Sequence, residues 1–247
     1  MKISRRHFNL LYQIVLNFFN FKRLRELHGD KVFVVLSSGH NGSTTVYYNL
    51  LLRFYRSKVF HVHVTSDYWW DIGIEKRRNR NDTLRKRYLR FKAENPHKQY
   101  VYISMVRDPI ERMISSFFHN GKDKSLDSIE WEDILSVSSL DKNIKWYSIE
   151  FRECFGIELE DIKFDRKRGY GKYYEGNVHL LVQRLDRLGC NDVLTDYFGP
   201  DFGSLISFNE RTTTHSGEDY RMVKKRLLDG NVYLEGNNEF RKLFWDD

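Results

Sequence analysis

A loop rich in glycine and hydroxyl groups follows the first strongly apolar run of the sequence. Residues 37–45 read SSGHNGSTT and precede a segment with helical character. Glycines let backbone amides approach a ligand, and the first amides of a helix have no partners within it. This pattern favours a bound anion, although a plain turn capped by serine or threonine is the alternative. No lysine follows the second glycine, so an ATP-type P-loop is excluded. The expected anion ligands are Gly39, Asn41, Gly42, Ser43, Thr44 and Thr45.

A second anion site is predicted where a strand passes into a sharply marked helix. Residues 105–119 read MVRDPIERMISSFFH. Asp108 suits the N-cap and Pro109 the first helical position. Arg107 then lies at the end of the strand, and Ser115 lies two turns into the helix. Arginine and hydroxyl groups bind phosphate, so this segment is predicted to hold a phosphate group. The alternative is a capped core helix with an arginine at the surface.

Two histidines one residue apart are candidate bases. His61 and His63 lie in the run KVFHVHV, which has strand character. Strand side chains alternate, so both imidazoles point to one face, and imidazole titrates near neutrality as a general base should. The alternatives are histidines hydrogen-bonded in the core, or a zinc site that lacks a third ligand. The sequence does not separate His61 from His63, and we expect no metal.

The elements that must hold these residues form an α/β pattern. Strands are predicted at residues 31–36, 58–64 and 99–106, and helices at 43–55, 74–95 and from 109 onward. This order favours right-handed crossovers and a central, mainly parallel sheet flanked by helices. Such sheets bind ligands at the carboxyl ends of their strands. After residue 127 we expect a helical C-terminal half, with short strands near 172–183.

The composition excludes several classes of protein. The 247 residues are 40% hydrophobic and 15% aromatic, which excludes a disordered chain. Two cysteines exclude a disulfide scaffold. Lys and Arg number 41 against 34 Asp and Glu, and the net charge of +7 indicates an anionic partner. Since no linker or repeat is visible, we expect one domain over residues 29–247.

Residues 1–28 are predicted to form an N-terminal amphipathic helix. The apolar stretch from Phe8 to Phe21 is too short and too polar to span a bilayer, and it lacks a signal-peptide cleavage site. This helix either packs on the domain or lies on an anionic membrane surface. We expect a cytoplasmic location in the first case and a membrane-peripheral one in the second.

The two anion motifs together resemble those of sulfotransferases that use 3′-phosphoadenosine 5′-phosphosulfate (PAPS). The resemblance implies a P-loop-like sulfotransferase fold in which residues 42–45 hold the 5′-phosphosulfate. It implies that Arg107 and Ser115 hold the 3′-phosphate, with adenosine 3′,5′-bisphosphate as the product. Many members carry a loop lysine where this chain has His40 or its neighbours, and a protonated His40 could partly replace it. A late loop that closes over the cofactor corresponds to residues 209–215 and makes Arg211 a further candidate phosphate ligand.

A third motif points to a carbohydrate acceptor. Residues 145–148 read KWYS, with Ile144 in place of asparagine. This run is similar to the Asn-Lys-Trp-Tyr-Ser signature of capsular polysaccharide synthesis proteins. The His-x-His of the second strand is similar to that of polysaccharide O-sulfotransferases, in which a histidine is the base. The resemblance implies in-line transfer of a sulfuryl group to a hydroxyl of a surface or capsular glycan. The alternative for Trp146 and Tyr147 is aromatic core packing.

The remaining basic charge leaves the partner open. Residues 76–92 carry nine Lys and Arg and one acid. They form either a solvated helix face or a rim that attracts an acidic glycan acceptor. The missing loop lysine motivates an alternative function, a non-catalytic member of the fold that binds a nucleotide or polyanion. Nucleic acid is not expected as a partner, because no binding motif is visible.

Overall fold

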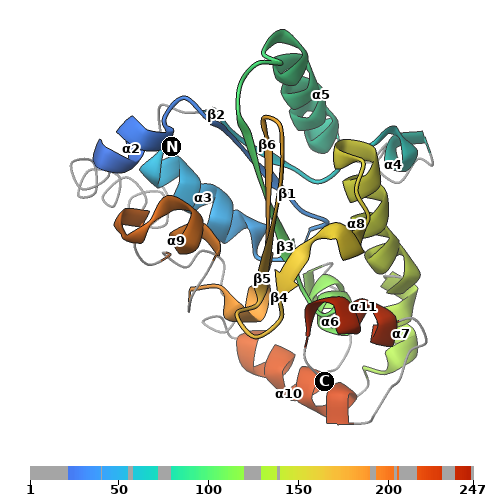
Figure 1. Cartoon of the computed structure of the whole chain (residues 1–247). Coiled ribbons are helices and arrows are strands. Elements are labelled where there is room, and N and C mark those ends of the chain that lie inside the picture. Colours follow the sequence, from blue (N-terminus) through green and yellow to red (C-terminus); the bar gives the residue numbers. More distant parts are fainter. Residues whose placement is uncertain are drawn as a thin grey trace, which may run out of the picture.

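The central feature of the fold is a single mixed sheet. The computed structural model describes residues 22–39, 41–54, 58–71, 79–119, 129–137, 140–189, 193–202, 205, 216–229 and 237–245. Within these residues six strands pair in the order β2-β1-β3-β6-β5-β4 (Figure 1). The strands are β1 (Val32–Leu36), β2 (Lys58–Val62), β3 (Tyr100–Val106), β4 (Lys163–Asp165), β5 (Tyr170–Glu175) and β6 (Val178–Arg184). The pairings β1–β2, β1–β3 and β3–β6 are parallel, whereas β5 is antiparallel to both β4 and β6. The predicted α/β fold with a mainly parallel sheet is confirmed.

Helices cover both faces of this sheet (Figure 1). One face carries α2 (Lys22–His28), α3 (Ser43–Arg53) and α9 (Val193–Phe198). The other carries α5 (Asn79–Glu94), α8 (Leu140–Phe155) and α11 (Asn237–Phe244). The short α4 (Asp67–Asp71) follows β2. A separate cluster beyond the end of β3 joins α6 (Pro109–His119), α7 (Trp131–Val137) and α10 (Ser216–Asp229).

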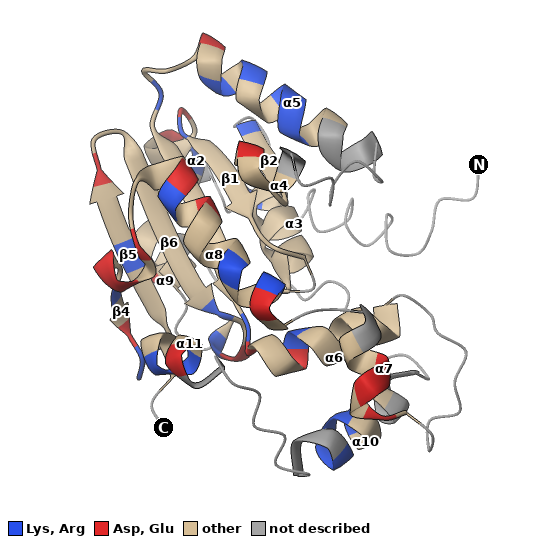
Figure 2. Cartoon of the chain, turned by 90° about the vertical axis from the view of Figure 1, so that its right-hand side faces the viewer, with Lys and Arg blue, Asp and Glu red and all other residues tan. Residues whose placement is uncertain are grey.

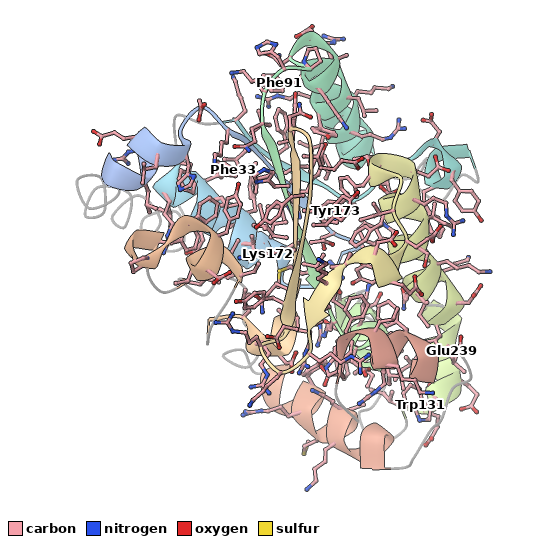
Figure 3. The ribbon with its side chains drawn as sticks, in the orientation of Figure 1. Phe33, Phe91, Trp131, Lys172, Tyr173 and Glu239 are labelled. Atoms are coloured by element: carbon pink, nitrogen blue, oxygen red, sulfur yellow. The ribbon has the colours of Figure 1, made fainter. Side chains whose placement is uncertain are left out.

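Alternate side chains of the strands enter two separate cores. Every residue of β1 and β3 is buried, as their continuous apolar runs predict for strands covered on both faces. Val34 packs in the core that contains Phe151 of α8, whereas Phe33 packs in the core of α3 and α9. Figure 3 shows the same alternation on β5, where Lys172 and Tyr173 lie on opposite sides of the sheet.

One element boundary matches its prediction, and another is changed by tertiary contacts. The helix predicted after β3 begins at Pro109, and Asp108 Oδ1 caps it by accepting from the amides of Ile110 (2.9 Å) and Glu111 (3.1 Å). In contrast, β2 ends at Val62, two residues early, because the backbone beyond it turns to hydrogen-bond α8.

The N-terminal prediction is only partly covered by the described residues. Residues 1–21 lie outside them, and α2 begins at residue 22. No helix in the part of the chain that the structure describes is long and apolar enough to cross a membrane.

Candidate active site

The loop after β1 turns at two glycines before α3 begins. Gly39 and Gly42 have φ values of 81° and 72°, in the left-handed region that favours glycine. A Cβ atom at Gly42 would lie 2.4 Å from Leu185 Cδ1, so the Leu185 side chain would have to move to admit a larger residue. Gly42 is the N-cap of α3 and has no side chain to occupy the first amides of the helix. This uncapped N-terminus, with the Ser43 and Thr44 hydroxyls beside it, is suited to an anion.

Asn41 braces this loop from inside the protein. Its side chain is fully buried, and Nδ2 lies within hydrogen-bond distance of three acceptors: Ser38 Oγ (2.8 Å), Tyr147 Oη (2.6 Å) and the carbonyl of Met105 (3.2 Å). Burial raises the pKa of Tyr147, so the phenol keeps its proton and donates to the same carbonyl (2.9 Å). The Asn41 side chain therefore ties the loop to the end of β3 and to α8.

Arg112 of α6 holds the same loop from the other side. Its guanidinium donates to the carbonyls of Ser38 (2.5 Å) and Gly39 (3.1 Å), and to Asn143 Oδ1 on α8. The side chain is 9% exposed, and burial lowers its pKa. Sequence alone indicated no role for this second arginine of residues 105–119. The available signal was its position three residues before Ser115, on the same side of the helix.

Arg107 follows β3 directly and lies between α6 and α10. Its side chain is 13% exposed; Nη2 donates to Tyr220 Oη (2.7 Å), and Nε lies 3.7 Å from the Glu111 carboxylate. Lys224 of α10 also pairs with Glu111 (2.7 Å). Ser115 is buried two turns along α6. Because β1 and β3 are parallel neighbours, Arg107 and the loop after β1 lie at the same edge of the sheet.

The two histidines reach the loop from β2 and from the residue directly after it. His61 Nε2 lies 3.0 Å from Ser43 Oγ, and its ring stacks on Tyr47 of α3 at a centroid distance of 5.3 Å. His63 Nδ1 lies 2.7 Å from the carbonyl oxygen of Ser37. Because a carbonyl can only accept, Nδ1 of His63 carries a proton. The two rings are 4.9 Å apart, so the structure brings both predicted bases to the predicted anion loop.

Comparison with known families accounts for this arrangement. The sequence profile of the sulfotransferase family matches residues 32–166, which is more than half of the chain. The chain belongs to the sulfotransferase family. The matched segment runs from β1 to the residue after β4 and contains the anion loop, the histidine pair and Arg107. Comparison with curated proteins and with solved structures gives no match.

In this sulfotransferase, α8 fixes the loop that follows the histidines. Trp146 Nε1 donates to the carbonyl of His63 (2.9 Å). The buried Glu150 carboxylate accepts from the Thr65 amide (2.8 Å) and hydroxyl (3.0 Å), and from the Ser66 hydroxyl. Trp146 and Tyr147 are core residues, which confirms the alternative prediction of aromatic core packing. Their polar atoms additionally hold the ends of two loops of the site.

The basic helix divides into buried and exposed charges. Arg85 is buried and donates to the carbonyl of Thr65 (3.0 Å) and to Asp67 Oδ1 (2.5 Å), so it supports the loop after β2 and does not belong to a rim. Lys86, Arg87 and Arg90 are exposed on the same helix. Figure 2 shows basic residues along the described length of α5. On the described part of α5, the predicted basic surface therefore includes these three side chains but not Arg85.

Two predicted ligands cannot be placed. His40 and Arg211 lie outside the described residues, as do residues 72–78 of the predicted basic helix. Among the residues that the structure does describe, no group of three or more His, Cys, Asp or Glu side chains is arranged to hold a metal ion.

Proposed function

We propose that this sulfotransferase moves a sulfuryl group from PAPS to a hydroxyl of a glycan. The observation that carries the proposal is the meeting of three groups at one sheet edge: an uncapped helix N-terminus, an arginine at the end of the next strand, and a pair of histidines. The first two suit a ligand with two separate phosphate groups. The third suits removal of a proton from a hydroxyl.

The residues at this edge fit the two anionic ends of PAPS. The first amides of α3, with the Ser43 and Thr44 hydroxyls, would hold the 5′-phosphosulfate. Arg107 would hold the 3′-phosphate, with Ser115 contributing from α6. Bound PAPS would supply an activated sulfuryl group whose leaving group is a phosphate. The bracing by Asn41 and the guanidinium of α6 supports this assignment, because it holds the cradle in one shape before a ligand arrives.

His63 is the better candidate for the general base in the proposed in-line displacement. Its Nδ1–H is held by the carbonyl of Ser37, which leaves Nε2 as the basic nitrogen of the neutral ring. The same contact stabilises the imidazolium that forms when Nε2 takes the acceptor proton. His63→Ala should lower turnover by about 10² to 10⁴-fold while keeping nucleotide affinity. Near-native turnover of this variant would refute the assignment.

The exposed charge on α5 bears on whether the glycan acceptor is acidic or neutral, and we assign the acidic class. The likeness to the capsular polysaccharide signature supports a polysaccharide acceptor, and the exposed Lys86, Arg87 and Arg90 of α5 support an acidic one. Transfer of labelled sulfate from PAPS to uronic-acid polysaccharides, compared with uncharged ones, tests this point. Equal transfer to both would refute the proposal that the basic residues of α5 attract an acidic acceptor.

Ligand-induced stabilisation tests the cofactor. At a free concentration of about 100 times its dissociation constant, adenosine 3′,5′-bisphosphate adds about 2.7 kcal/mol of stability. For a chain of this size that raises the melting temperature by about 5–10 °C. ATP should give less, Arg107→Ala should lose most of the shift, and Arg90→Ala on the exposed face of α5 should keep it. No shift at millimolar bisphosphate, or an unchanged shift in Arg107→Ala, would refute the cofactor.

A second candidate function is a non-catalytic member of the family that binds a nucleotide or a polyanion. The observation that favours it is the absence of lysine from residues 37–45. In that case the bisphosphate would stabilise the protein as above, but no acceptor would gain sulfate from PAPS. A membrane contact through residues 1–28 stays a prediction.

A further inference from the structure

One turn of α3 holds His61 on two sides. Ser43, at the start of the helix, contacts the edge of the imidazole through Oγ, 3.0 Å from Nε2. Tyr47 covers the face of the same ring, with an interplanar angle of 28°. Residues four apart lie on the same side of a helix, so both contacts follow from one docking of α3 against β2. Ser43 is 4% exposed, which limits its hydroxyl to few orientations.

The Ser43 hydroxyl connects this ring to the anion loop. A hydroxyl has one hydrogen to donate. When Ser43 donates that hydrogen to an anion at the start of α3, its oxygen can contact His61 only as an acceptor. Nε2 of His61 must then carry a proton. An anion in the loop and a proton on this nitrogen therefore favour each other.

The groups that face His61 are compatible with a charged ring. Among the described residues, the rings that pack against it belong to Tyr47 of α3 and to His63, which directly follows β2, and its partner on β1, Val35, is apolar. The tyrosine ring face attracts a cation. Two charged imidazoles 4.9 Å apart would repel each other, so a charge on His61 keeps His63 neutral. A neutral ring is the state in which His63 can accept a proton.

We propose that His61 is a positioning residue that acts through Ser43. Its imidazolium donates to Ser43 Oγ, and the Ser43 hydroxyl in turn donates to the phosphate or phosphosulfate group in the loop, so the charge of the ring supports that anion through the serine. The two histidines thus take different parts: His61 supports negative charge in the loop, and His63 receives the acceptor proton. The inference rests on the proposed function, because the anion is the 5′ end of the cofactor.

Nitrogen NMR of histidine-labelled protein tests the coupling without turnover. The probe is adenosine 3′,5′-bisphosphate at fixed neutral pH, and His61→Gln identifies the signals of His61. On binding, the Nε2 signal should move toward that of a protonated nitrogen, while Nδ1 of His63 stays protonated. Ser43→Ala should abolish the movement and Ser43→Thr should restore it. Arg152→Ala, a change at the exposed surface of α8, should keep it.

Binding measurements separate this inference from the function on which it rests. Titration calorimetry should show about tenfold weaker bisphosphate binding to His61→Gln, the size of one charge-assisted hydrogen bond. If the bisphosphate binds and the Nε2 signal is unchanged, or moves equally in Ser43→Ala, the coupling is wrong and the proposed function survives. If the bisphosphate does not bind the wild-type protein, both are wrong.

Discussion

Replacing Arg112 by alanine tests whether the anion loop depends on its brace. The guanidinium donates to two loop carbonyls, those of Ser38 and Gly39, and to the Asn143 side chain of α8. Alanine removes all three donors and leaves the acceptors to find other partners. The variant should therefore lose stability and lose the shape of the cradle together.

The size of the effect follows from burial. A hydrogen bond to a charged group contributes about 1.5–3 kcal/mol when nothing replaces it. Water can reach the half-buried carbonyls of Ser38 and Gly39, but Asn143 is buried. We expect a net loss of about 3 kcal/mol in the free energy of unfolding, near the lower end for breaking a buried charged network. In a chain of this length that lowers the melting temperature by about 6–12 °C.

Thermal unfolding by circular dichroism, with and without adenosine 3′,5′-bisphosphate, measures both effects. Arg112→Ala should melt early and bind the bisphosphate at least about tenfold more weakly. Arg112→Lys keeps the charge but not the fork of donors, so its melting temperature and its bisphosphate affinity should fall between those of the wild type and Arg112→Ala. Arg152→Ala is the matched control, because this exposed arginine of α8 pairs with Glu158 at the surface, and the variant should melt like the wild type. Wild-type melting and binding in Arg112→Ala would refute the brace.

Three further variants probe separate parts of the site. Gly42→Ala should destabilise the protein by about 1–3 kcal/mol in urea unfolding, because its φ is left-handed and its Cβ meets Leu185; an unchanged midpoint would contradict the geometry. Tyr220→Phe removes an acceptor that orients Arg107, so calorimetry should show about fivefold weaker bisphosphate binding and unchanged binding of adenosine 5′-phosphate. An equal loss for both nucleotides would count against that role. Glu150→Gln should lower the melting temperature by several degrees, since an amide nitrogen would face hydrogen-bond donors; wild-type melting would show that the carboxylate is dispensable.

Local sequence was sufficient to predict β1 and the start of α6. The run KVFVVL predicts a strand covered on both faces, and β1 is buried throughout. Asp108 and Pro109 predict a helix start because a cap and a fixed φ act within a few residues. The helix starts there, with the predicted cap in place.

The brace of the site could not be predicted in the same way. Asn41 contacts Met105 and Tyr147, which are 64 and 106 residues away along the chain. No local pattern encodes such pairs, because they depend on which strands become neighbours and how α8 docks. Arg85 illustrates the same limit, since nothing in a run of basic residues indicates which one turns inward to Asp67.

The position of α8 along the chain has a consequence for how the protein is made. Synthesis proceeds from the N-terminus, so the loops after β1, β2 and β3 emerge before the helix that fixes them. Asn143, Trp146, Tyr147 and Glu150 each hold a segment that was synthesised earlier. A nascent chain that ends at residue 139 already carries both candidate bases and Arg107, yet none of these four contacts. The loops of the site in a growing chain therefore gain these four contacts only once residue 150 has left the ribosome.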